Sequence, residues 1–260
     1  MRIVIKGAGD IASGIALRLR HCGFDIIMTE LAFPTSIRRT VCFSEAVFHG
    51  KATVEDEQAI LCTPHNVESA LNEGKIAVLV DPNCNCVDTL KPDALVDARL
   101  MKRNVDTKIT DAPFVVGVGP GYTAGKDCHA VVETQRGHRL GRVIWKGSAE
   151  ANTGIPGSIA GFSVERLLRS PCNGIFTPVK CIGDEVNKGD VAATVNGVPM
   201  ICLIGGTLRG LLPDGTEVFE GMKSGDVDPR CQREHCFTAS DKALAVAGGV
   251  LEAILCQNQK

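Results

Sequence analysis

The chain has 260 residues, a formal net charge of −2 and 44% apolar residues, which is ordinary for a soluble globular protein of about one or two domains. This charge balance provides no basic surface and argues against general nucleic-acid binding. The sequence contains no apolar run long enough to span a membrane, and its start, MRIVIKGAGD, looks like a first strand and not a signal peptide. We therefore expect a cytoplasmic protein that does not bind membranes.

Strand and helix signals alternate through the first 150 residues. Apolar runs predict strands at 2–6, 25–30, 76–81, 94–99 and 114–118, and helical spacing predicts helices at 11–21, 36–48 and 63–72. Strands that are apolar on both faces and alternate with helices are typical of a parallel, doubly wound sheet. We predict an α/β fold with a Rossmann-like ligand-binding domain over residues 1–165.

A glycine-rich turn follows the first predicted strand. Gly7, Gly9 and Ala12 fit the relaxed G-x-G-x-x-G/A pattern of dinucleotide-binding turns, and Glu30 ends the second strand where a ribose-binding acid would lie. Asp10 lies within the turn and would repel a pyrophosphate unless it binds a metal or caps the helix. The alternative is that the glycines serve only the turn between strand and helix.

A second glycine-rich stretch, 119–142, carries many charged groups. Gly119 and Gly121 would let the main chain approach a small anion, and Lys126, Arg136 and Arg142 would supply positive charge. The alternative is a solvated surface loop.

His129, Glu133 and His138 in the same stretch are candidate catalytic residues. Two imidazoles and one carboxylate can form an acid–base set or hold a metal. His129 and Glu133 share one face of a strand because their spacing is even. The histidines could instead bond only to nearby backbone, and we assign no metal site.

The pattern changes near residue 170. From there to about residue 222, short strands alternate with turns such as Asn196-Gly197, which predicts a compact all-β module over 170–225. A helix is expected at 238–256 with Thr238 and Asp241 at its start. It would belong to a C-terminal segment, 236–257, packing back on the first domain.

Twelve cysteines are scattered along the chain, and two clusters stand out, Cys84-Asn85-Cys86 and Cys231 with Cys236. Neither has the C-x-x-C spacing of a zinc ribbon. Each could be a metal or chalcogen site, although a free cysteine is more often a small buried hydrophobe.

The β module resembles biotinyl/lipoyl-type domains. The segments SPCNGIF, IGDEVNKGD and DGTEVFEG match the two halves of that fold, and Pro199 takes the place of the carrier lysine. The resemblance implies a barrel-sandwich module that carries no covalent biotin or lipoate.

Nearly the whole chain resembles the accessory proteins of selenium-dependent molybdenum hydroxylase systems, which are related in role to xanthine dehydrogenase accessory factors. The matching segments include VIKGAGDIASGIALRL, GVGPGYTAGKDCHAVVETQRGHRLGRVIW, DVDPR and SDKALAVAGGVLEAIL. The resemblance implies a maturation factor that binds a molybdopterin-type cofactor or an anionic nucleotide and docks the apo-hydroxylase.

Two other functions are left open, an NAD(P)-dependent oxidoreductase and a non-enzymatic docking scaffold for the apo-hydroxylase. The first rests on Gly7, Gly9 and Glu30, and the second on the lysine-less β module. The sequence does not decide whether the protein is an enzyme, and a homo-oligomer is possible.

Overall fold

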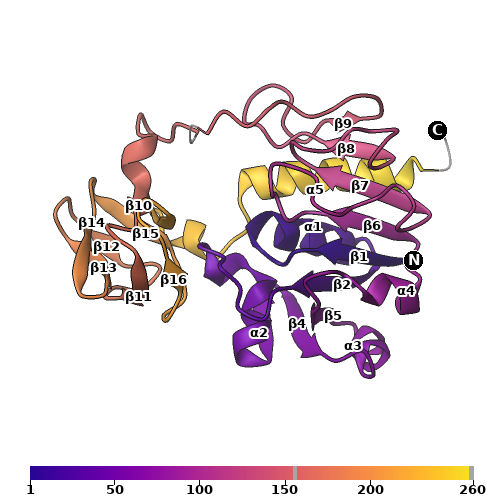
Figure 1. Ribbon diagram of the computed structural model, residues 1–260, viewed down its shortest axis with the longest axis horizontal. Coiled ribbons are helices and arrows are strands. Elements are labelled where there is room, and N and C mark those ends of the chain that lie inside the picture. The colour runs from indigo at the N-terminus through magenta and orange to yellow at the C-terminus, as the bar shows by residue number, and fades with distance from the viewer. Residues whose placement is uncertain (155–156, 258–260) are drawn as a thin grey trace. The chain divides into compact units, whose positions relative to one another are not determined.

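The computed structural model describes residues 1–154 and 157–257 and divides into two compact units (Figure 1). Unit 1 comprises Met1–Pro34, Cys42–Thr153 and Ala239–Lys260. Unit 2 comprises Thr35–Val41 and Gly154–Thr238. Each unit therefore contains segments that are distant in the sequence.

Unit 1 is built on one nine-stranded sheet with the order β3-β4-β5-β2-β1-β6-β7-β8-β9. The strands are β1 (Arg2–Lys6), β2 (Asp25–Glu30), β3 (Lys51–Val54), β4 (Glu57–Cys62), β5 (Ile76–Val80), β6 (Ala94–Asp97), β7 (Phe114–Val118), β8 (Ala130–Val132) and β9 (Val143–Ile144). Only the outer pairs β3–β4 and β8–β9 are antiparallel in this sheet. The α/β class predicted from sequence is confirmed.

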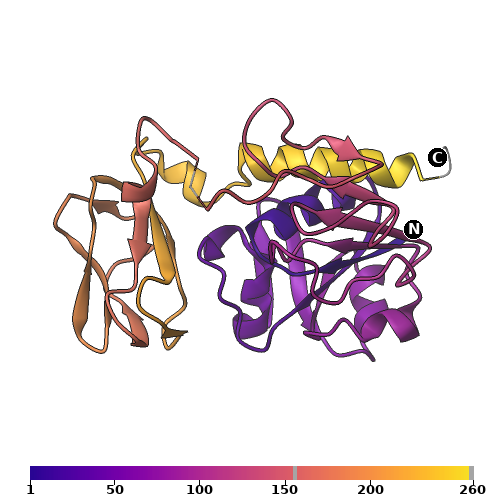
Figure 2. The same ribbon diagram turned by 45° about the horizontal axis from the view of Figure 1, so that its top comes forward.

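Five α-helices are described, all of them in unit 1: α1 (Asp10–His21), α2 (Ala46–His49), α3 (Val67–Asn72), α4 (Cys86–Leu90) and α5 (Asp241–Leu255). On one face of the sheet, Val4, Ile27, Leu79 and Leu95 form a core with side chains of α3 and α4. Figure 2 shows α5 along the other side of the sheet, where it packs against α1. Both faces are thus covered, as the apolar character of the strands requires.

The contact between α1 and α5 depends on small residues. A Cβ atom at Gly14 of α1 would lie 2.7 Å from the Cβ atom of Ala243 in α5, so the two backbones approach closely. The α5 helix begins after Ser240, whose hydroxyl accepts a hydrogen bond from the Ala243 amide at 3.1 Å. Ser240 is the cap, and the start predicted at Thr238 with Asp241 was wrong.

The observed structure differs from the sequence predictions in three places. The predicted helix 36–48 is broken into η1 (Arg39–Val41), η2 (Phe43–Glu45) and α2 because the chain passes from unit 2 to unit 1 between Val41 and Cys42. Residues 51–62, given no element above, form the β3–β4 hairpin. The third difference is that α3 is shorter than the predicted helix 63–72.

Unit 2 consists of two four-stranded sheets with the orders β10-β17-β15-β12 and β14-β13-β11-β16. The strands are β10 (Leu167–Arg169), β11 (Gly174–Pro178), β12 (Glu185–Val186), β13 (Val191–Val195), β14 (Val198–Ile201), β15 (Gly206–Leu211), β16 (Glu217–Val218) and β17 (Lys223–Asp228), with the short helices η3 (Val164–Arg166) and η4 (Arg233–Cys236). All of the strand pairs are antiparallel among the residues described. Asn196 and Gly197 have positive φ values of 48° and 82° and form the hairpin turn between β13 and β14.

The two neighbouring glycines of α5 face different surroundings and provide a matched test of packing. A Cβ atom at Gly249 would clash with the Gly141 carbonyl oxygen, whereas a Cβ atom at Gly248 would meet nothing within 4 Å. We expect Gly249→Ala to lower the free energy of unfolding by about 1–3 kcal/mol through overpacking. Gly248→Ala should leave it unchanged or raise it by up to about 1 kcal/mol. Urea denaturation of the two variants measures this, and equal effects would contradict the packing described.

Candidate functional site

A buried charged group ends the first strand of unit 1. Lys6 is 4% exposed, and its Nζ atom donates to Thr107 Oγ1 at 2.9 Å and to Asp106 Oδ1 at 3.1 Å. Asp111 lies 3.7 Å from the same ammonium group. These three partners come from the connection between β6 and β7, residues 98–113, which contains no helix. The connection is thus held against the sheet by polar contacts.

A second buried charge, Asp97, ends the adjacent strand β6. Its carboxylate accepts from Arg99 Nη2 at 2.6 Å, from Arg99 Nε at 3.0 Å and from Thr107 Oγ1 at 2.6 Å. Burial alone would raise the pKa of Asp97, but these donors and the Arg99 charge hold it below its ordinary value. Asp97 is therefore ionised, and Thr107 links it to Lys6.

The turn after β5 carries a pair of cysteines. The Asp81 carbonyl accepts from the Cys84 amide at 3.0 Å, and the Asp81 carboxylate accepts from the Cys86 amide at 2.8 Å. Cys84 has φ +57°, in the left-handed region that residues other than glycine rarely adopt. This fixed turn holds the two cysteines, which are two residues apart, next to each other.

The two thiols differ in their electrostatics. The hydrogen bond from Cys86 lowers the pKa of Cys84 and outweighs its burial, and Lys6 and Thr29 lower it further. The same hydrogen bond to Cys84, together with burial and the charge of Asp81, raises the pKa of Cys86 well above the ordinary range. The arrangement favours a thiolate at Cys84 and a protonated thiol at Cys86.

A cavity of about 670 Å³ adjoins the pair. Its walls come from the connections 83–92 and 106–113, and Lys6 and Cys84 both line it, whereas Cys86 does not. Lys91, Lys108 and Asp88 add further charges to the lining. The cavity gives a small polar molecule a route to the Cys84 thiol.

The residues predicted to bind a dinucleotide lie around the first turn of unit 1. Gly7 has φ +94° and Gly9 precedes α1, which begins at Asp10. Glu30 binds the protein's own backbone, because its carboxylate accepts from the Ala8 amide at 2.9 Å and the Leu31 amide at 2.8 Å. The Ala8 amide belongs to the turn that was expected to bind phosphate, and in this structure it donates its hydrogen bond to Glu30 instead.

The second predicted set, in 119–142, is dispersed. Gly119 has φ +84° and Gly121 has φ +109°, each in a tight turn. Lys126 and Arg142 are exposed. Arg136 forms two hydrogen bonds to Asp241 at the start of α5, at 2.7 and 2.9 Å.

His129, Glu133 and His138 do not converge on one point. His129 precedes β8 and Glu133 follows it, so the two lie at opposite ends of that strand. The Glu133 carboxylate accepts hydrogen bonds from three backbone amides, those of Thr134, Gln135 and Glu150. His129 Nδ1 accepts from the Val115 amide at 2.9 Å, and burial lowers its pKa. Glu133 and His138 do share a cavity of about 300 Å³ that His129 does not line.

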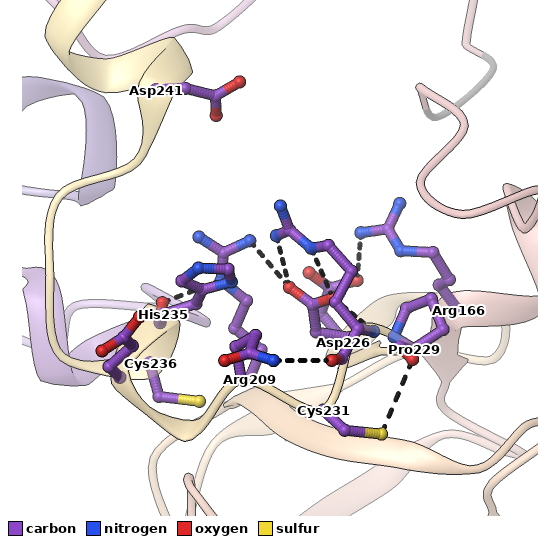
Figure 3. Close-up of polar contacts among 12 residues, drawn as sticks. Arg166, Arg209, Asp226, Pro229, Cys231, His235, Cys236 and Asp241 are labelled. Carbon is purple, nitrogen blue, oxygen red and sulfur yellow. Dashed lines mark hydrogen bonds and ion pairs between the residues drawn. The ribbon is translucent and has the colours of Figure 1, made fainter.

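Unit 2 contains a cluster of arginines and aspartates. The buried carboxylate of Asp226 accepts from Arg166 at 2.9 Å and from Arg38 at 3.1 Å, and Figure 3 shows the Arg166 contact. Asp228, on the same face of β17, accepts from Arg230 at 2.6 Å and from Arg209 at 3.2 Å. Such mutually paired charges connect β17 with β15 and the segment 35–41.

The second cysteine cluster lies beside these arginines but is not a pair. Figure 3 shows the Cys231 thiol directed at the Pro229 carbonyl, at 3.5 Å. The buried Cys236 thiol donates to the Leu208 carbonyl at 3.8 Å. Throughout 1–154 and 157–257, no three His, Cys, Asp or Glu side chains are grouped closely enough to hold a metal ion. Over the same ranges, no helix is long and apolar enough to cross a membrane.

Lys6 and the thiols of Cys84 and Cys86 were not among the predicted site residues. The sequence singled out the cysteine cluster by its spacing alone. The signal for Lys6 is a lysine that ends an apolar strand directly before a glycine turn. That pattern does not by itself predict a functional residue, because the burial of Lys6 depends on the β6–β7 connection that covers it.

Acid sensitivity of unit 2 should depend on Asp228. Burial alone would raise its pKa, but hydrogen bonds from Arg230 and the charges of Arg230 and Arg209 hold the pKa at about 2, below the ordinary value of about 3.9. A depressed carboxyl pKa stabilises the fold above pH 4, and this contribution, roughly 2 kcal/mol, disappears as the pH falls toward 2.

We therefore expect Asp228→Asn to destabilise unit 2 strongly at pH 6 and about half as much at pH 3. Urea unfolding at the two pH values measures this difference. Asp214→Asn, at an exposed position of the same unit, is the control and should have no effect at either pH. A penalty for Asp228→Asn that does not change with pH would contradict the pairing.

Comparison with known proteins gives few functional clues. No family model matches the chain. An uncharacterized protein of Escherichia coli strain K12, YqeB, is 50% identical over 254 residues. The match covers 97% of this chain but only 47% of that protein, so the chain spans about half the length of its curated relative.

Three solved structures show weak likeness. A succinylglutamate desuccinylase/aspartoacylase from Rhodobacter sphaeroides is 19% identical, with a TM-score of 0.23. The match covers 33% of this chain and 29% of that protein's chain. An aspartoacylase family protein from Mesorhizobium loti and a succinylglutamate desuccinylase from Silicibacter are 11% and 12% identical, with TM-scores of 0.29 and 0.26; each match covers 87% of this chain and 84% of the other. Because every TM-score is below 0.5, the neighbours' activities do not transfer to this chain.

These comparisons correct the assignment made from sequence. The solved structures belong to a different family from the molybdenum hydroxylase accessory proteins, and the Escherichia coli relative is uncharacterized. The predicted accessory role, with its selenium, molybdenum and biotinyl/lipoyl associations, was wrong, and the oxidoreductase and docking-scaffold alternatives gain no support. The predicted ligands and partners are not tested by these comparisons.

Proposed function

We propose that unit 1 is a thiol-dependent enzyme that uses Cys84 as its nucleophile on a small polar molecule. The observation that carries this proposal is the pairing of two thiols in one fixed turn, with one of them lining a cavity beside a buried lysine. A thiolate is the reactive form of cysteine, and adjacent positive charge and hydrogen-bond donors favour it.

Each neighbour of Cys84 has a distinct role. The Cys86 thiol donates to the Cys84 sulfur and stabilises its negative charge. Lys6 contributes positive charge from the end of β1, and its own position is fixed by Asp106 and Thr107. Burial makes these interactions stronger than they would be in water.

The cavity restricts the substrate class. Its volume of about 670 Å³ is in the range for small-molecule sites. Its lining combines Lys91 and Lys108 with Asn83 and Asn85, so a polar molecule with hydrogen-bond acceptors fits it better than an apolar one.

The position of the site also agrees with the finer fold that we infer for unit 1, a Rossmann-like domain. The central strands β5-β2-β1-β6-β7 are all parallel, and ligands of such sheets bind beyond the carboxyl ends of the strands. Lys6 and Asp97 are the last residues of β1 and β6, and the cysteine turn follows the carboxyl end of β5.

The proposal predicts selective alkylation. With limiting iodoacetamide at pH 7, Cys84 should react faster than the exposed Cys22 and Cys181 despite its burial, because a larger fraction of it is thiolate. Lys6→Met removes a positive charge that favours the thiolate, so Cys84 should react several-fold to about tenfold more slowly. Peptide mass spectrometry measures both rates.

Lys108→Met is the matched control, since it removes a lysine from the same cavity that does not contribute to the ionisation of Cys84. In this variant the alkylation rate of Cys84 should equal the rate in the unaltered protein. If Cys84 reacts more slowly than the exposed cysteines, or if both lysine variants behave alike, Cys84 is not the activated nucleophile.

A further inference from the structure

The two cysteines of the β5–α4 turn are placed unequally. Both side chains are buried in the core on this face of the sheet, but only Cys84 lines the cavity, and Cys86 is the first residue of α4. A molecule in the cavity therefore meets Cys84 first. Cys86 does not line the cavity and is placed to react with what becomes attached to Cys84.

We propose that this pair carries out thiol–disulfide exchange on small-molecule disulfides, with Cys86 as the resolving cysteine. This inference rests on the proposed function, because it requires Cys84 to be the nucleophile. It adds a reaction, a substrate class and a role for Cys86.

The exchange proceeds in two steps. In the first, the Cys84 thiolate attacks one sulfur of the substrate R–S–S–R, forming a Cys84–S–S–R mixed disulfide and releasing RS⁻. In the second, Cys86 attacks the Cys84 sulfur, which forms the Cys84–Cys86 disulfide and releases the second RS⁻. The protein is oxidised by two electrons and the substrate is reduced to two thiols. A dithiol reductant, oxidised in its turn, returns the pair to the starting state.

The surroundings of Cys86 supply a path for its proton. Before reaction, the neighbouring Cys84 thiolate is the main group that keeps Cys86 protonated. Once Cys84 carries the R–S group, that negative charge is gone and Cys86 ionises more readily. The Asp81 carboxylate, which already accepts a hydrogen bond from the Cys86 amide, accepts the proton and passes it to the departing RS⁻.

The fixed turn makes the second step intramolecular. The Cys86 amide donates a hydrogen bond to the Asp81 carboxylate at 2.8 Å, and the Cys84 amide donates one to the Asp81 carbonyl at 3.0 Å. The two cysteines are two residues apart in one hydrogen-bonded turn, which gives resolution the advantage of proximity. Cys231 and Cys236 lack this arrangement, since each thiol bonds to a different backbone carbonyl.

The test uses oxidised glutathione as the probe, with the full chain and its Cys86→Ser and Cys84→Ser variants. Each is incubated with the probe, quenched in acid and digested with trypsin. The fragment 76–99 contains Cys84 and Cys86 and no other cysteine, so its mass reports on this pair alone. Circular dichroism confirms that each variant is folded.

We expect the unaltered protein to yield fragment 76–99 with two hydrogens fewer, as the internal disulfide. Cys86→Ser should trap one glutathione on Cys84, and Cys84→Ser should leave Cys86 unmodified. Asp81→Asn should form the mixed disulfide at the normal rate but close it about 100-fold more slowly, since general-base assistance is lost.

The failures are distinguishable. If Cys86→Ser traps glutathione but the unaltered protein also stops at the mixed disulfide, Cys86 does not resolve it and this inference is wrong, while Cys84 remains a nucleophile. If Cys84 is never modified in any of the proteins although iodoacetamide alkylates it quickly, disulfides are not substrates. If it resists both reagents, the proposed function fails as well.

Discussion

The arrangement of the site depends on two charges buried at the ends of adjacent parallel strands. Lys6 and Asp97 lie side by side in register on β1 and β6, and an unpaired buried charge would cost several kcal/mol. Both are satisfied by the connection after β6: Lys6 by Asp106 and Thr107, and Asp97 by Arg99 and Thr107. This connection consequently folds against the sheet without forming a helix, and in doing so it builds one wall of the cavity.

The consequence for chemistry is that Lys6 is held beside the cysteine turn. A flexible, solvated lysine would be screened and would influence a thiol weakly. Fixed and buried, it combines with Cys86 to favour the thiolate of Cys84. The opposite pKa shifts of the two thiols follow from one hydrogen bond, which Cys86 donates and Cys84 accepts. Two chemically identical side chains two residues apart thereby acquire different roles.

Much of the fold of unit 1 could be predicted from sequence because its strands are apolar on both faces. The runs at 2–6, 25–30 and 114–118 become β1, β2 and β7 with the same bounds. The break in 36–48 could not be predicted, since it arises where the chain crosses between two units. The β3–β4 hairpin was missed because its turn, Glu55-Asp56, lacks glycine and needs a positive φ at Glu55.

The site was harder to predict than the fold. Clusters of charge drew attention to 119–142, but Glu133 binds backbone amides and Arg136 pairs with Asp241. The Glu133 contacts depend on a local turn, and the Arg136 contact joins residues 105 positions apart, so no spacing rule predicts either. The cysteine pair was visible as a spacing, yet its importance depends on Lys6, 78 positions earlier in the sequence, and on a cavity formed by a connection with no regular structure.

The central claim is that Cys84 is a thiolate while its neighbour Cys86 stays protonated. The most direct measurement is an NMR titration of the protein with ¹³C-labelled cysteine Cβ atoms, with Cys84 and Cys86 assigned by substitution. The account predicts that the Cys84 resonance changes at a pH below that of an ordinary thiol and that the Cys86 resonance does not change up to the highest pH at which the protein remains folded. Titration of both resonances together, or of Cys84 at a higher pH than Cys86, would contradict it.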